Sequence, residues 1–132
     1  MLLDREQFIN IEYLDYTKKV FDDCFGDDVK LIEEVYSNGS GGMGAYELTY
    51  EYLKKPYQIV FDYERLRFRI EITWENAYTN FFQGRHTEYK KRLNRDDIKK
   101  AIQILKKDID DDALVFYTIK KNGQLKKLEK QL

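Results

Sequence analysis

The sequence has almost no cysteine, histidine or proline: its 132 residues include one residue of each type. A single cysteine, Cys24, excludes a disulfide within the chain and favours a reducing compartment. Because His86 is the only histidine, the chain cannot assemble a histidine–cysteine cluster of the kind that holds zinc. We therefore expect a cytoplasmic protein that carries no metal and no cofactor.

Long apolar runs are also missing. No segment approaches the roughly 20 consecutive apolar residues of a membrane-spanning helix. Residues 1–6 do not place an apolar stretch after a basic one, so we expect no secretory signal. With 42% hydrophobic and 15% aromatic residues, the chain has the composition of a folded protein. Its length predicts one domain, residues 1–132, with a core of its own.

The clearest pattern in the sequence is an alternation of apolar and polar residues from Ala45 to Trp74, in three consecutive segments. Period-two alternation is typical of strands with one buried face and one face open to water. The apolar positions are Tyr46, Leu48, Tyr50, Tyr52, Tyr57, Ile59, Phe61, Tyr63, Leu66, Phe68, Ile70, Ile72 and Trp74. The segments therefore predict an antiparallel meander.

A register follows from pairing the inward residues of the last two segments. If Phe61 faces Phe68, then Ile59 faces Ile70, and on the outer face Asp62 lies opposite Arg67. Opposite charges in such a cross-strand pair stabilise a sheet by less than about 1 kcal/mol. We predict this register for the second hairpin.

Two segments have the helical periodicity of amphipathic helices. The first, capped by Asp4 or Asn10, is expected to run to about Phe25, and Gly26 suits the position that ends it. The second is expected to begin after Asn94, which is a favourable capping residue. The positions predicted to be buried are Ile9, Tyr13, Tyr16, Val20, Phe21 and Cys24 in the first helix and Ile98, Ala101, Ile102, Leu105 and Ile109 in the second.

The remaining strands give weaker signals. Residues 29–36 are rich in β-branched side chains, but Glu33-Glu34 breaks their alternation, which indicates an uncertain register and a possible bulge. Residues 75–93 show no clear period.

At the C-terminal end, residues 113–120 predict a strand, and Asn122-Gly123 is typical of a two-residue hairpin leading into 124–129. The complete order is α-β-β-β-β-α-β(-β). Such an order indicates the α+β class, in which a mostly antiparallel five- to six-stranded sheet packs against two helices.

The sequence contains no recognisable catalytic motif. The glycine-rich segment Ser37–Gly44 leads into a strand, whereas phosphate-binding loops lead into a helix, so we interpret it as a flexible connection. Cys24 lies on the apolar stripe of the first helix and is expected to be an inert core thiol. Nothing in the local sequence supports a Cys24–His86 dyad. We therefore expect that the chain is not an enzyme.

The residues that we expect to serve the function of the chain are acidic and aromatic. Five carboxylates point to the outer face of the predicted meander, and an aromatic segment follows it. Tyrosine and tryptophan are frequent interface anchors, and acidic surroundings accelerate association with a basic partner. The residues that we predict to bind a partner are Glu47, Glu51, Asp62, Glu64, Glu71, Tyr78, Phe81 and Phe82.

In its size, its one-domain α+β layout, its lack of a catalytic set and its acid- and tyrosine-rich strands, the chain resembles a small bacterial immunity protein. The resemblance lies in overall character across the chain. It implies a cytoplasmic inhibitor that neutralises a toxin, often a basic nuclease, by covering the toxin's active site with acidic and aromatic side chains.

Two other functions remain open at this point. One is a small enzyme or ligand-binding protein with a tyrosine-lined pocket between sheet and helices. The other is binding to a nucleic-acid backbone through the second helix, because residues 85–132 hold fourteen basic and eight acidic residues. Its basic residues would be Lys99, Lys100, Lys106 and Lys107.

Overall fold

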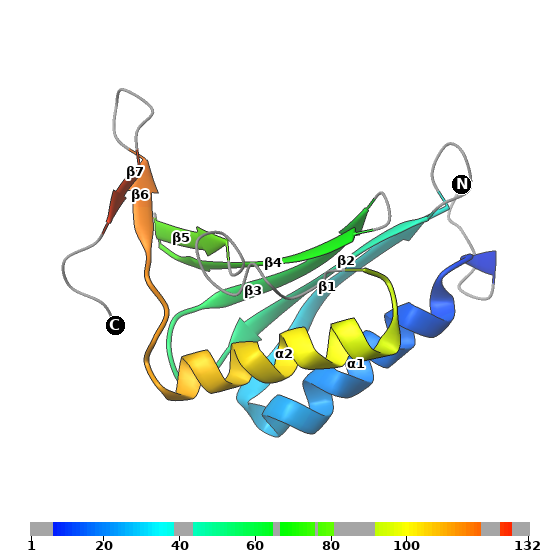
Figure 1. Cartoon of the computed structure of the whole chain (residues 1–132), viewed down its shortest axis with the longest axis horizontal. Helices are drawn as coiled ribbons and strands as arrows, with labels where there is room; N and C mark the ends of the chain where they lie inside the picture. Colours follow the sequence, from blue (N-terminus) through cyan, green and yellow to red (C-terminus); the bar gives the residue numbers. More distant parts are fainter. Residues whose placement is uncertain are drawn as a thin grey trace.

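The described residues fold into one antiparallel sheet with two α-helices packed on the same face (Figure 1). The computed structural model describes residues 7–38, 44–64, 67–75, 77–80, 92–119 and 125–127. The helices are α1 (Ile11–Phe25), followed by a short 3-10 helix, η2 (Gly26–Asp28), and α2 (Arg95–Asp110). The strands are β1 (Val29–Ser37), β2 (Ala45–Tyr52), β3 (Gln58–Glu64), β4 (Arg67–Trp74), β5 (Ala77–Asn80), β6 (Tyr117–Ile119) and β7 (Leu125–Lys127).

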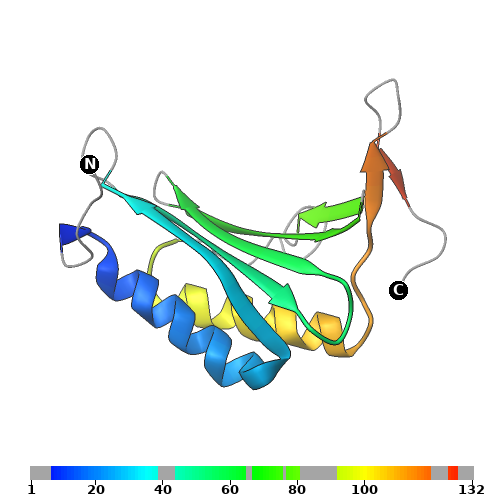
Figure 2. The same cartoon turned by 180° about the vertical axis from the view of Figure 1, so that it is seen from behind.

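This architecture confirms the α+β class. In the described part of the chain the sheet has seven strands, and their spatial order repeats their order along the chain. One strand more than expected precedes α2, because β5 forms within the region that showed no clear period. Seen from behind, α1 and β1 lie at the front of the molecule, and α1 runs beside α2 (Figure 2).

The inner face of β2, β3 and β4 forms the core, as the alternation predicts. The described apolar positions of the meander are buried, apart from Trp74, which is half-buried. Their rings pack closely against one another and against α1: the ring centroids of Phe21 and Tyr50 are 4.2 Å apart, and those of Tyr46 and Phe61 are 5.9 Å apart. The helices therefore cover an aromatic layer.

The predicted register of the β3–β4 hairpin is wrong by two residues. Phe61 lies opposite Ile70, and Asp62 lies opposite Arg69. Only residues 65 and 66 separate the two strands, which makes this a tight hairpin with Glu64 opposite Arg67. A shift of two residues leaves every side chain on the same face, so alternation cannot distinguish the two registers.

Helix α1 is rotated about its axis relative to the predicted stripe. The buried residues are Leu14, Thr17, Val20, Phe21 and Phe25. Ile9 precedes the helix and is 59% exposed, and Cys24 is only half-buried. The predicted stripe omits the apolar Leu14 and Phe25, and it also omits Thr17, a polar residue that a search for apolar positions passes over. Its hydroxyl is satisfied in the core by the carbonyl of Tyr13 at 2.7 Å and the hydroxyl of Tyr46 at 2.9 Å.

Strand β1 contains the bulge that its broken alternation indicates. The pairing with β2 shifts between Leu31 and Glu33, so Ile32 is the additional residue. After the bulge, Glu34 lies opposite the inward-facing Leu48 and accepts a hydrogen bond from Lys18 of α1 at 2.9 Å. Val35 consequently faces away from the helices.

Helix α2 agrees with the sequence in detail. Asn94 caps it, accepting a hydrogen bond from the backbone N–H of Asp97 at 2.8 Å. All five predicted apolar positions are buried, and Asp108 joins them at 5% exposure. Strand β6 begins later than expected, at Tyr117, and Leu114 and Phe116 are buried in the segment that precedes it. Neither helix, in the described part of the chain, has the length and apolar character needed to cross a membrane.

Candidate functional site

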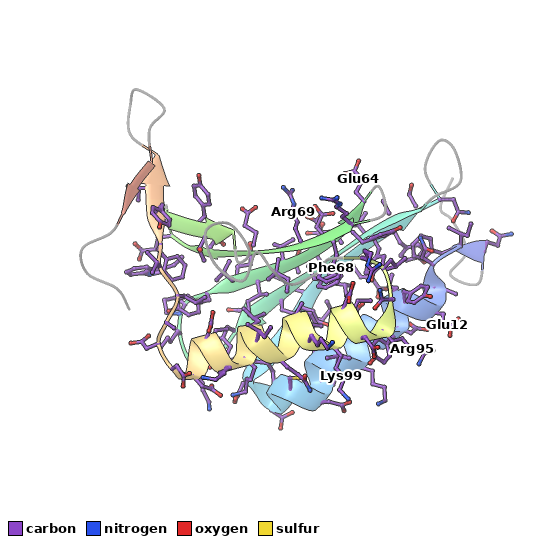
Figure 3. All side chains as sticks on the ribbon, in the orientation of Figure 1. Glu12, Glu64, Phe68, Arg69, Arg95 and Lys99 are labelled. Carbon is purple, nitrogen blue, oxygen red and sulfur yellow. The ribbon has the colours of Figure 1, made fainter. Side chains whose placement is uncertain are left out.

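The sheet face that points away from both helices, here called the outer face, carries most of the predicted binding residues. Figure 3 shows Glu64 and Arg69 on this side, whereas Phe68 points between the sheet and the helices. The strand registers place the other predicted carboxylates on the same face: Glu47, Glu51, Asp62 and Glu71. None of the described helices lies over it (Figure 1).

The aromatic residues predicted beside this face are only partly described. Tyr78 of β5 is half-buried and lies opposite Thr73 of β4 and Tyr117 of β6, which places it at one end of the outer face. Phe81 and Phe82 lie outside the described residues. Of the three predicted aromatic residues, Tyr78 is therefore the one that the structure describes, at the edge of the acidic surface.

Glu47 is the electrostatic centre of the outer face. It lies directly opposite Asp62, and like charges so placed repel each other. Partial burial raises the pKa of Glu47, and the neighbouring carboxylates of Asp62 and Glu33 raise it further. Arg69 opposes this shift, but its Nε donates to Oδ2 of Asp62 at 3.0 Å. The face therefore retains an excess of negative charge around Glu47.

Two hollows adjoin Glu47 and Asp62 on this face. One, of about 160 Å³, is lined by Val35, Tyr36, Ser37, Ala45, Tyr46, Glu47 and Asp62. The other, of about 230 Å³, is lined by Glu47, Val60, Asp62, Arg69 and Glu71. The first is bordered by apolar groups of β1 and β2, and the second is mainly acidic.

The sequence did not identify three residues of this surface. Glu33 and Val35 were missed because the bulge at Ile32 reverses the alternation of β1. Val60 was missed because a single valine among polar outward residues resembles ordinary surface variation. The signal that could have indicated a hollow there is the presence of two valines, Val35 and Val60, on a face whose other side chains are mostly charged or polar.

Known proteins offer no guide to this surface. Comparison with them finds no matching family model, no matching curated protein and no matching solved structure. The function must therefore be argued from the geometry and charge of the chain itself.

The possible nucleophile, Cys24, is poorly suited to catalysis. Burial raises the pKa of its thiol, and the carboxylate of Asp23 adds to this effect, while Lys106 and Lys99 oppose it. A thiol with a raised pKa holds little thiolate at neutral pH. His86 lies outside the described residues, so the Cys24–His86 dyad stays untested. Among the described residues no group of three or more histidine, cysteine, aspartate or glutamate side chains is arranged so that it could hold a metal ion.

A tyrosine-lined pocket between sheet and helices would need free space beside the inward tyrosines. Instead, the ring of Tyr50 stacks on Phe21, and Tyr46 packs between Phe61 and Tyr63, with ring centroids 5.9 and 5.6 Å away. Every buried side-chain nitrogen or oxygen in the described part of the chain has a hydrogen-bond partner. These tyrosines act as packed core residues.

The basic side of α2 is partly neutralised by its own acids. Lys106 pairs with Asp110 at 2.6 Å, and Lys107 pairs with Asp111 at 2.5 Å. Lys99 and Lys100 remain exposed on this helix. Arg95 lies over the ring of Tyr16 and bonds to Glu12 at 2.6 Å (Figure 3). Phosphate binding would have to compete with these ion pairs.

The ends of the glycine-rich segment are fixed although residues 39–43 lie outside the described ones. The side chain of Asn38 accepts from the backbone N–H of Ile9 at 2.8 Å and donates to the carbonyl of Gln7 at 3.1 Å. Gly44 has a φ of 74°, and an added Cβ would lie 2.8 Å from Cγ2 of Ile9. The segment thus leaves β1 and enters β2 at defined positions.

Proposed function

We propose that the chain is a protein-binding inhibitor whose outer face covers the functional site of a basic partner. In the terms of the resemblance to immunity proteins, the partner is a toxin domain, and the inhibitor acts in the cytoplasm without chemistry of its own. The observation that carries the proposal is a sheet face rich in carboxylates that no described element covers.

The charge balance of the outer face supports a basic partner. Its carboxylates are Glu33, Glu47, Glu51, Asp62, Glu64 and Glu71. Among the described residues the basic ones of the same face are Lys30, Arg67 and Arg69 on β1 and β4, together with Arg92, which is bridged to Arg67 and pairs with Asp97, so negative charge prevails on β1 to β4. An acidic surface raises the rate at which a positively charged protein finds it and favours one orientation of the encounter.

The rigid strands beneath the outer face also support its role in binding a partner. The outer side chains of β2, β3 and β4 stand on strands whose inner side chains are buried in the aromatic core. A surface held in this way loses little conformational freedom on binding, so more of the interaction free energy appears as affinity. Tyr78 adds an aromatic ring of the type that anchors interfaces.

The test uses charge reversal away from the two hollows. The tagged chain is used to capture a partner from its native host, and the association rate of the purified partner is then measured. Changing Glu33→Lys together with Glu51→Lys should slow association at low salt by about tenfold or more. The captured protein, expressed alone, should arrest growth, and co-expression of the chain should restore it.

The matched control places the same charge change elsewhere. Asp22→Lys with Asp27→Lys alters exposed residues of α1 and η2, outside the outer face. This control should leave the association rate within about twofold of the original. An association rate that is unchanged in the outer-face variant, or equally slowed in the control, would show that the outer face is not the binding surface.

A further inference from the structure

We infer that the two hollows of the outer face are adjacent subsites for one segment of the partner: the hollow beside Val35 takes an apolar side chain, and the hollow beside Glu71 takes the cationic side chain of a lysine or arginine. This inference rests on the proposed function, because it assigns the chemistry by which the outer face recognises its basic partner.

The apolar subsite exists because of the bulge in β1. With Ile32 as the additional residue, Val35 faces outward opposite Glu47, although Glu34 beside it faces the helices. Val35 is 49% exposed and borders the hollow of about 160 Å³ together with Ala45. The hollow has room for a branched aliphatic side chain, and covering Val35 would remove apolar surface from water.

The cationic subsite has more negative charge than its own residues neutralise. The hollow of about 230 Å³ brings three carboxylates together with one guanidinium, that of Arg69. Arg69 bonds to Asp62, and no described hydrogen bond or ion pair holds the carboxylates of Glu47 and Glu71. A cationic side chain placed between them would relieve the repulsion between Glu47 and Asp62.

The occupant is a side chain of a protein and not a metal ion. The described carboxylates that line the hollow are not arranged with metal-binding geometry. A lysine or arginine brings one positive charge on a long apolar stem, and the stem can lie along Val60.

The spacing of the hollows fits neighbouring side chains of one segment. Val35, Glu47, Asp62 and Arg69 form a row across four strands, and Glu47 and Asp62 border both hollows. Neighbouring strands lie about 4.8 Å apart, so the subsites are separated by roughly one to two such steps. Side chains at i and i+2 of an extended segment are about 6.6 Å apart. The matching sequence is therefore an apolar residue, any residue, then lysine or arginine.

The test is an NMR titration of the full chain, labelled with ¹⁵N, with blocked tripeptide amides. Acetyl-Leu-Ser-Arg-amide and acetyl-Leu-Ser-Lys-amide should shift the amide signals of Val35 and Ala45 together with those of Glu47 and Glu71. Replacing Leu by Ser, or Arg by the neutral citrulline, should each weaken binding by about fivefold, since each removes one of two comparable contacts. Equal binding of all peptides, or shifts spread over the surface, would overturn the inference.

Single variants assign each subsite. Val35→Thr should abolish the preference for Leu over Ser and keep the preference for Arg over citrulline, and Glu71→Gln should have the opposite effect. Glu51→Gln is the matched control, because Glu51 lies on the outer face and lines neither hollow. Equal weakening by Glu51→Gln would show diffuse attraction in place of two subsites.

The two proposals can fail separately. If the tripeptides do not bind but the variant with Glu33→Lys and Glu51→Lys associates with the captured partner more slowly, as expected, the subsites are wrong and the proposed function stands. If the tripeptides bind as expected but this variant associates with the partner at an unchanged rate, the proposed function is wrong.

Discussion

Thr17 shows how one polar side chain can organise an aromatic core. Its hydroxyl forms hydrogen bonds with the carbonyl of Tyr13 and with the hydroxyl of Tyr46. The side chains of Thr17 and Tyr46 are both buried. A buried hydroxyl that loses its partner costs more than a hydrogen bond whose two ends are removed together. The two partners of this bond should therefore respond differently to mutation.

Thr17→Val should destabilise the fold by about 1–3 kcal/mol, because it leaves the hydroxyl of Tyr46 buried without a partner. Tyr46→Phe should cost about 1 kcal/mol or less, since Thr17 still donates to Tyr13. Urea unfolding measures both changes, with Thr17→Ser as the control that keeps the hydroxyl. A larger loss for Tyr46→Phe than for Thr17→Val would contradict this account.

Buried tyrosines also predict how the fold responds to alkali. Burial raises the pKa of both Tyr46 and Tyr50 far above the usual value of about 10. Their contribution to stability is full below pH 10, where folded and unfolded chains are both neutral. Above it only the unfolded chain ionises, so the free energy of unfolding should fall by up to about 1.4 kcal/mol per pH unit for each tyrosine.

Urea unfolding at several pH values between 8 and 11 checks this prediction. The slope above pH 10 should decrease when Tyr50 is replaced by Phe, because that variant has lost one of the tyrosines whose pKa is raised by burial. An unchanged slope would mean that Tyr50 ionises normally in the folded chain.

At the scale of single elements, the bulge in β1 makes a deletion unusually informative. Without Ile32, Leu31 would face inward and Glu33 would follow facing outward, so both halves of β1 would keep their present orientation in a regular strand. Deletion of Ile32 should therefore preserve the fold at a cost of about 1 kcal/mol or less.

Deletion of Thr49 from β2 is the matched comparison. Strand β2 is regular, so losing one residue would turn half of its buried side chains to water and should prevent folding. Circular dichroism and thermal unfolding distinguish the two outcomes. A folded Thr49 deletion, or an unfolded Ile32 deletion, would show that the register is not set as described.

The N-terminus of α2 provides a second element-scale test. Asn94→Ala removes the side-chain oxygen that accepts from Asp97 and should lower stability by about 0.5–2 kcal/mol. Asn94→Asp keeps a capping oxygen and should recover most of the loss. Equal losses in both variants would indicate that Asn94 contributes through another contact.

The sequence predicted an element correctly where a single pattern, alternation or helical periodicity, determined which residues are buried. Alternation was sufficient for the buried face of β2 to β4, and apolar periodicity was sufficient for α2. The β3–β4 register depended on a choice between arrangements with identical faces. In α1 the apolar residues allowed more than one stripe, and the buried one includes the polar Thr17. The outward carboxylates followed from alternation, but Val35 and the hollows required a bulge whose position and consequence are set by pairing with β2.

At the scale of the whole molecule, charge separates the two sides. The outer face is acidic, whereas the exposed side of the helices mixes lysines with acids in ion pairs such as Lys106–Asp110. If acidic steering governs encounter with the partner, the association rate should fall by about tenfold between low and high salt, while the dissociation rate changes far less. Stopped-flow kinetics at several salt concentrations measures both rates, and a salt-independent association rate would contradict steering.

The sheet order has a consequence for how the chain is made. Since each strand pairs with its immediate predecessor, every ladder closes over a short stretch of chain, apart from the step that spans α2. During synthesis, β1 to β5 can pair one after another before the C-terminal third of the chain has left the ribosome. Until α2 has been synthesised, α1 alone would cover the apolar face of these strands. The rest of that face would stay exposed until α2 packs on it.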